Sequence, residues 1–86
     1  MALDWKRILD CEHNGRPVYE YEAVDNGIRY HIYWSCDAGF GLSISYYDGR
    51  GNPPDAPTSI AWWRALYRCK EAAERYRGKH SEAEAA

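Results

Sequence analysis

The sequence predicts an α+β fold, in which a three-stranded antiparallel sheet carries a short N-terminal helix and a longer C-terminal helix on one face. Three observations predict it. Asn26-Gly27 lies between two runs of β-forming residues, and this dipeptide favours a two-residue type I′ turn. Residues 42–47 alternate apolar and polar side chains, as a half-buried strand does. Residues 62–76 have apolar side chains at helical spacing.

The Asn-Gly turn fixes the pairing of the two strands that it joins, over residues 19–34. With Asn26 and Gly27 as the two-residue loop, the register places Glu22 opposite His31. Opposed residues share a face of the sheet, so each face can be assigned. One face is predicted to belong to the core, and it carries Tyr19, Tyr21, Ala23, Ile28, Tyr30, Ile32 and Trp34. The other face is mainly polar and carries Glu20, Glu22, Val24, Arg29, His31 and Tyr33.

The third strand is predicted to pair antiparallel with the second, and Leu42, Ile44 and Tyr46 then join the core face. Residues 48–57 are dense in glycine and proline, so they end the strand in a loop. Loops of this length are often functional.

Residues 4–12 are predicted to form the N-terminal helix. Asp4 is a candidate N-cap, and Asn14-Gly15 would end the helix. The apolar residues at i, i+3 and i+4 that would dock it on the sheet are Trp5, Ile8 and Leu9.

The C-terminal helix is predicted to begin at Thr58 or Ser59 and to run to about Arg77, with Gly78 at its C-cap. Its predicted core stripe comprises Trp62, Ala65, Leu66, Cys69, Ala72, Ala73 and Tyr76. Residues 1–78 then form a single domain, and residues 79–86 form a flexible tail.

The predicted α-β-β-β-α order resembles that of the double-stranded-RNA-binding domain over most of the chain. The string GRPVYEY at 15–21 is similar to the entry of that family into its first strand. In the family, a lysine cluster that grips phosphates opens the last helix. Here the corresponding residues 58–64 read TSIAWWR, so the resemblance implies the topology and not the RNA-binding residues.

The composition indicates a cytoplasmic protein. No apolar run approaches the ~20 residues of a membrane span, and the first residues lack the apolar core of a signal peptide. The three cysteines, Cys11, Cys36 and Cys69, form no C-x-x-C pair and are expected to be reduced thiols.

Catalysis has one candidate pair, Glu22 and His31, which are neighbours on the polar face. A carboxylate beside an imidazole can act in general acid–base chemistry, but an open sheet face offers no pocket. Opposite charges across strands are also ordinary stabilising pairs. Cys11-x-His13 has no recognised zinc spacing, and no glycine-rich phosphate loop precedes a helix. We therefore expect no enzyme activity, no metal and no cofactor.

The outer face of the C-terminal helix is the candidate binding site, and it comprises Trp63, Arg64, Tyr67 and Arg68. Trp, Tyr and Arg dominate protein interfaces, so we expect a non-catalytic protein-binding module of the regulator or inhibitor type, such as a phage-encoded inhibitor. Three alternatives stay open. The same arginines, with Arg75, would suit RNA or single-stranded nucleic acid. The patch could instead join a homodimer, or Trp63 and Tyr67 could simply complete the core.

Overall fold

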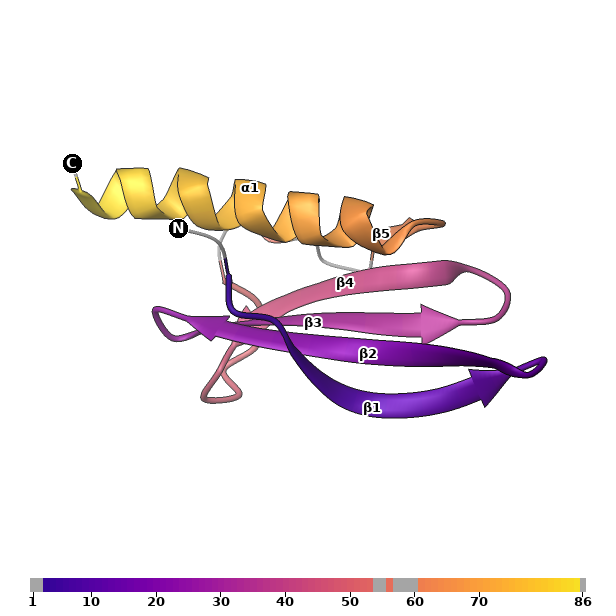
Figure 1. Cartoon of the computed structure of the whole chain (residues 1–86). Helices are drawn as coiled ribbons and strands as arrows, with labels where there is room; N and C mark the ends of the chain where they lie inside the picture. The colour runs from indigo at the N-terminus through magenta and orange to yellow at the C-terminus, as the bar shows by residue number, and fades with distance from the viewer. Residues whose placement is uncertain (1–2, 54–55, 57–60, 86) are drawn as a thin grey trace.

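The computed structural model describes residues 3–53, 56 and 61–85. Its elements are β1 (Lys6–His13), β2 (Arg16–Asp25), β3 (Ile28–Ser35), β4 (Gly39–Tyr46), β5 (Ala61–Trp63) and α1 (Leu66–Ala85). The strands form one antiparallel sheet in chain order, and α1 lies across one of its faces (Figure 1). The prediction of an α+β fold with an antiparallel sheet and a C-terminal helix is confirmed. The predicted three strands and N-terminal helix are wrong.

The turn between β2 and β3 forms as predicted. Asn26 and Gly27 have φ values of 55° and 78°, and both central residues of a type I′ turn require positive φ. The register that follows from it is confirmed from Asp25 opposite Ile28 to Tyr21 opposite Ile32, and it includes the pair Glu22–His31. The predicted pairing of β4 with β3 is also confirmed.

The predicted N-terminal helix is the strand β1, which pairs antiparallel with β2. Asn14-Gly15 does not end a helix but forms a second two-residue turn, with φ values of 52° and 79°. The register of β1 against β2 shifts between Arg7 and Leu9, so Ile8 is an extra residue in a β-bulge. This irregularity obscures the alternation that would mark a strand. The αβββα order, and with it the topological resemblance to the RNA-binding family, is therefore wrong.

The C-terminal helix begins at Leu66 and not at Thr58 or Ser59, which lie outside the described residues. Trp62 and Trp63 belong to β5, where they lie opposite Gly41 and Phe40 of β4. Strand alternation turns these two side chains to opposite faces, so Trp62 is 42% exposed and not part of the core stripe.

The helix also ends later than predicted. Gly78 lies within α1, and residues 79–85, which we expected to form a tail, continue the helix as far as Ala85.

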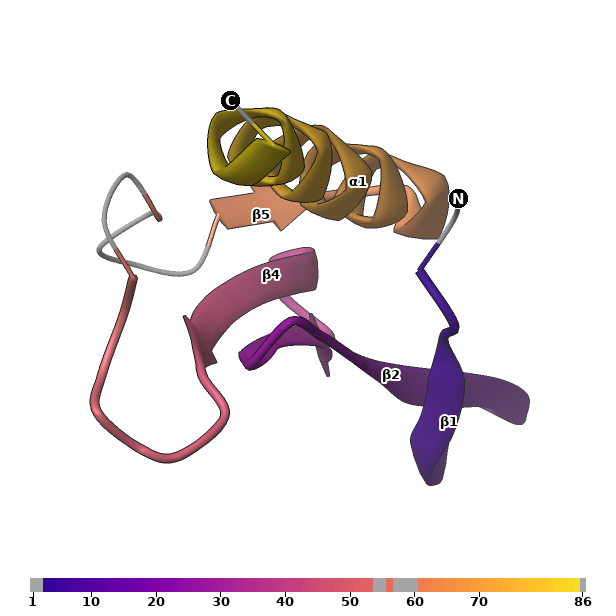
Figure 2. The same cartoon turned by 90° about the vertical axis from the view of Figure 1, so that its left-hand side faces the viewer.

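The core lies between α1 and the sheet. Its buried apolar residues are Leu3, Ala23, Tyr30, Ile32, Leu42, Ile44, Cys69 and Ala73. The predicted core residues Tyr19 and Trp34 are half-buried and are not among the side chains that pack against this core. Because α1 contacts β4 and β5, the sheet extends beyond the helix toward β2 and β1 (Figure 2). Tyr19 is covered instead by the guanidinium of Arg7 at 4.3 Å, and Trp34 lies 5.0 Å from the ring of His13.

Three polar contacts connect α1 with the N-terminal half of the chain. The backbone N–H of Leu3 donates to the carboxylate of Glu74. The Lys70 ammonium lies 4.8 Å from the ring centre of Tyr21. Arg77 Nε donates to Asp25 Oδ2 at 3.0 Å, beside the β2–β3 turn. These contacts hold residues 70–77 of the helix against the N-terminal half of the chain.

Candidate functional site

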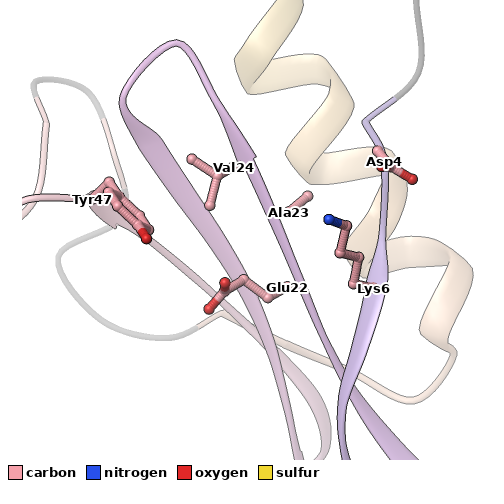
Figure 3. A pocket seen from close by; sticks show the side chains of 6 residues that line it. All are labelled: Asp4, Lys6, Glu22, Ala23, Val24 and Tyr47. Atoms are coloured by element: carbon pink, nitrogen blue, oxygen red, sulfur yellow. The ribbon is translucent and has the colours of Figure 1, made fainter.

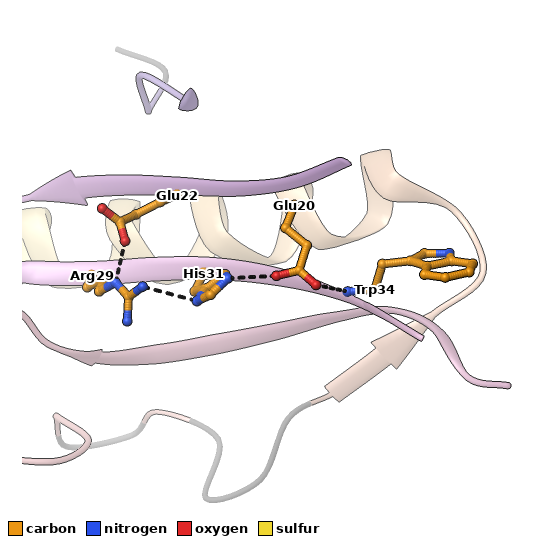
Figure 4. A network of polar contacts seen from close by, with 5 residues as sticks. All are labelled: Glu20, Glu22, Arg29, His31 and Trp34. Atoms are coloured by element: carbon orange, nitrogen blue, oxygen red, sulfur yellow. Dashed lines mark hydrogen bonds and ion pairs between the residues drawn. The ribbon is translucent and has the colours of Figure 1, made fainter. Parts of the chain in front are cut away.

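A chain of polar side chains crosses β2 and β3 on the sheet face opposite α1 (Figure 4). Arg29 Nε donates to a Glu22 carboxylate oxygen, and Arg29 Nη2 lies 3.2 Å from His31 Nδ1. His31 Nε2 lies 3.4 Å from Glu20 Oε1. The other oxygen of Glu20 accepts a hydrogen bond from the backbone N–H of Trp34 at 3.3 Å. We call Glu20, Glu22, Arg29 and His31 the polar network.

The contacts of His31 define its tautomer. Arg29 can only donate, so Nδ1 accepts and the ring proton is on Nε2, which donates to Glu20. Burial lowers the pKa of His31, and the positive charge of Arg29 lowers it further, although the contact with Glu20 acts in the opposite direction. The imidazole is therefore neutral at pH 7, and each of its nitrogens already has a hydrogen-bond partner.

Glu22 and His31 lie opposite each other as predicted, but they do not form an acid–base pair. Glu22 binds Arg29, whereas His31 binds Glu20. His31 is only 8% exposed, because the ring of Tyr33, two residues along the same face, stacks on it at 3.7 Å. Neither nitrogen of this histidine is free to take a proton from a substrate, so the geometry is that of a structural network.

An open hollow of about 310 Å³ lies next to this face, near the start of β1 (Figure 3). Its lining residues are Asp4, Lys6, Glu22, Ala23, Val24 and Tyr47. The charged groups of Asp4, Lys6 and Glu22 do not converge on one point, and Glu22 is already bound to Arg29. The hollow therefore lacks the convergent polar groups of a ligand site.

The four predicted binding residues are divided by the structure. Trp63 packs against the core from β5. Arg64 is exposed between β5 and α1, Tyr67 is 58% exposed in the first turn of α1, and Arg68 is also exposed. The Arg68 guanidinium lies 5.3 Å from the ring centre of Tyr67. We call Arg64, Tyr67 and Arg68 the junction surface.

Trp62 is an exposed aromatic residue that helical reasoning placed in the core. The signal that would have identified it is the pairing of residues 61–63 with β4, because alternation along a strand separates two consecutive tryptophans. Trp62 lies opposite Gly41, which has no side chain to cover it.

The basic residues farther along α1 are partly neutralised by neighbours. Arg75 Nη2 lies 3.9 Å from Glu71, and Arg77 binds Asp25 and lies 3.9 Å from Glu74. The continuous arginine ridge that would suit a nucleic-acid backbone is thus interrupted by carboxylates.

The cysteines and the possible metal ligands in the described part of the chain do not form a recognisable site. Cys69 is fully buried, and burial raises the pKa of its thiol to about 11, so it packs as a small apolar side chain. Cys11 and Cys36 are exposed free thiols. Among the described residues, no group of three or more His, Cys, Asp or Glu side chains is placed to hold a metal ion.

No protein-family model, curated protein or solved structure matches this chain. None of the helical residues that the structure describes forms a segment long and apolar enough to cross a membrane. The functional inference therefore depends on the surfaces described above.

Proposed function

We propose that this protein is a small non-catalytic module that binds another protein through the junction surface. The observation that carries the proposal is Tyr67, a large side chain that is 58% exposed at the start of α1 and lies between two exposed arginines in the sequence. Tyr and Arg are enriched among the residues whose truncation most weakens protein complexes.

The geometry of the junction surface supports this role. Arg68 lies over the ring of Tyr67, and a cation–π contact at an exposed site favours this arrangement by about 0.5–1 kcal/mol. Such a preference in the free protein reduces the entropy that the two side chains lose on binding. Both residues are also held on a helix in which the next residue, Cys69, is buried in the core, so the surface has a rigid support.

A non-catalytic role is supported by the polar network. His31 is a buried histidine, and its two nitrogens are taken by Arg29 and Glu20. A general base needs a nitrogen or oxygen within reach of the substrate proton. This arrangement stabilises the sheet instead.

The test is a binding measurement with the variants Tyr67→Ala and Arg68→Ala. A partner captured on the wild-type chain is purified, and its affinity for each variant is measured by calorimetry. We expect each variant to bind roughly tenfold or more weakly. Arg75→Ala is the matched control, because Arg75 is also exposed on the same helix, about two turns beyond Arg68, and this variant should bind within about twofold of wild type.

Unchanged affinity in both junction variants would contradict the proposal. A nucleic-acid partner is distinguished by salt, because each phosphate contact makes affinity fall more steeply with ionic strength. Retention of single-stranded RNA that is lost steeply with added salt, and lost with Arg68→Ala, would assign the surface to nucleic acid instead.

A further inference from the structure

We propose that β1 pairs antiparallel with β1 of a second copy of the chain, with Arg7 of each copy opposite Glu12 of the other, so that one sheet continues across two molecules. This contact uses the sheet edge and not the junction surface. A test of the dimer is therefore independent of a test of the protein-binding function proposed above.

The position of β1 leaves one side of its backbone available. β1 is the first strand in the sheet order, and in the described part of the chain it pairs with β2 alone. All eight of its residues are exposed. Figure 1 shows β1 at the edge of the sheet farthest from α1. An edge strand presents a row of N–H and C=O groups with which another strand can pair.

The charges of β1 are complementary to themselves when the strand is reversed. The strand begins with Lys6 and Arg7 and ends with acidic residues, Asp10 and Glu12, before His13. In an antiparallel pair of two identical strands, the basic start of each therefore lies against the acidic end of the other. A two-fold axis makes every such contact occur twice.

The bulge at Ile8 is what makes these charges meet. Arg7 lies opposite Tyr21 and Glu12 lies opposite Pro17, and these two residues of β2 share a face. In a regular strand, residues five apart point to opposite faces. The extra residue in the bulge restores Arg7 to the face of Glu12, so the two side chains can pair across the two-fold axis.

The same register brings apolar groups together on the other face. Leu9 lies opposite Glu20 and Cys11 opposite Val18, so both point to the face opposite α1. With Ile8 of each copy left out of the pairing, as it is against β2, Arg7 opposite Glu12 places Leu9 of one copy beside Cys11 of the other. Leu9 is 49% exposed and Cys11 is exposed, so this contact would remove apolar surface from water.

One contact opposes the pairing and limits its strength. The two Asp10 side chains lie nearest to the two-fold axis, each with its own Arg7 at 3.9 Å. Like charges directly opposite each other destabilise a sheet. We therefore infer a weak and reversible dimer.

Charged side chains and bulges usually protect an edge strand from foreign strands. Here the same two devices are arranged so that a reversed copy of β1 carries the matching charges at the matching places. A second copy of this chain is consequently the partner that the edge fits.

The test measures the dissociation constant of the dimer by sedimentation over a wide range of protein concentration. Arg7→Glu and Glu12→Arg should each weaken the dimer roughly tenfold, because each change puts like charges together at two symmetric contacts. The double variant Arg7→Glu/Glu12→Arg restores opposite charges and should return to within about threefold of wild type. Asp10→Asn removes the repulsion at the axis and should tighten the dimer.

The wild-type chain provides a second measurement that does not depend on any substitution. Amide chemical shifts that change with concentration should be confined to residues 6–13. If Arg7→Glu fails to fold because it loses Tyr19, the variants Glu12→Arg and Asp10→Asn still decide the question. A chain that stays monomeric at all concentrations would overturn the proposal. A dimer with shifts elsewhere, or a double variant as weak as the single ones, would do so too.

Discussion

At the scale of single residues, His31 shows how a polar side chain can be buried on the outer face of a sheet. The ring is stacked on Tyr33 and bonded through both nitrogens, so its burial leaves no polar atom without a partner. A buried and satisfied group of this kind favours the neutral imidazole. The stability of the fold should therefore depend on pH in the range where histidines titrate.

The expected direction follows from the lowered pKa of His31. An unfolded histidine titrates at about pH 6.5, and the folded ring takes up its proton only at lower pH. The unfolded chain therefore binds the proton more readily between the two pKa values. We therefore expect the contribution of His31 to the free energy of unfolding to be complete above about pH 6.5 and to decrease as the pH falls below that value.

Chemical denaturation between about pH 7.5 and pH 5.5 measures this dependence. The variant His31→Gln should lose most of it, and His13→Gln, a change in an exposed histidine outside the polar network, should keep it. An undiminished slope in His31→Gln would mean that another group is responsible.

At the scale of elements, the chain contains two hairpins with the same turn chemistry and different surroundings. Asn14-Gly15 joins β1 to β2, and Asn26-Gly27 joins β2 to β3, with glycine φ values of 79° and 78°. The β1–β2 hairpin, which we call the outer hairpin, contains the fully exposed strand β1, whereas β3 of the β2–β3 hairpin contains the buried Tyr30 and Ile32. The same backbone strain placed in the two turns should therefore lower the free energy of global unfolding by different amounts.

An alanine at either glycine adopts a left-handed conformation that costs about 1 kcal/mol or more. Gly27→Ala should lower the free energy of global unfolding by about this amount. Gly15→Ala should instead speed amide hydrogen exchange within residues 6–13 and leave the protection of β3 and β4 unchanged. Equal losses of global stability in the two variants would show that the outer hairpin unfolds together with the core.

The sequence predicted the inner hairpin well because its turn and its alternation agree. It mispredicted β1 because the bulge at Ile8 gave Trp5, Ile8 and Leu9 a helical spacing, although Asn14-Gly15 carried the same turn signal as Asn26-Gly27. The pairing of β5 with β4 is a tertiary contact that the local sequence does not reveal, so Trp62 was wrongly predicted to be in the core and Trp63 to be exposed. Of the predicted binding residues, Arg64, Tyr67 and Arg68 are exposed, whereas Trp63 is half-buried.

At the scale of the whole molecule, the N-terminal segment is held against the C-terminal helix α1. Leu3 is 7% exposed within the core, and its backbone N–H donates to Glu74 of α1. Terminal residues are usually poorly ordered unless such contacts hold them. The first described residue therefore contributes to the stability of the whole fold.

We expect Leu3→Ala to lower the free energy of unfolding by about 2 kcal/mol or more, the usual cost of removing a buried leucine side chain. Ile8→Ala is the matched control, because Ile8 is a similar side chain that is 43% exposed, and its effect should stay near about 0.5 kcal/mol. Denaturant unfolding measures both. Similar values for the two variants would contradict the packing of Leu3 in the core.

The bulge at Ile8 has a consequence for how this chain can change in evolution. The residues before it in β1, Lys6 and Arg7, keep their face only because one extra residue is present, and they directly follow Trp5, which packs against the core. Deleting a single residue from β1 would exchange the two faces of everything on the N-terminal side of the deletion. A change in the length of β1 would therefore alter both the packing of Trp5 and the positions of the charged side chains at the sheet edge. We expect β1 to tolerate substitutions far better than insertions or deletions.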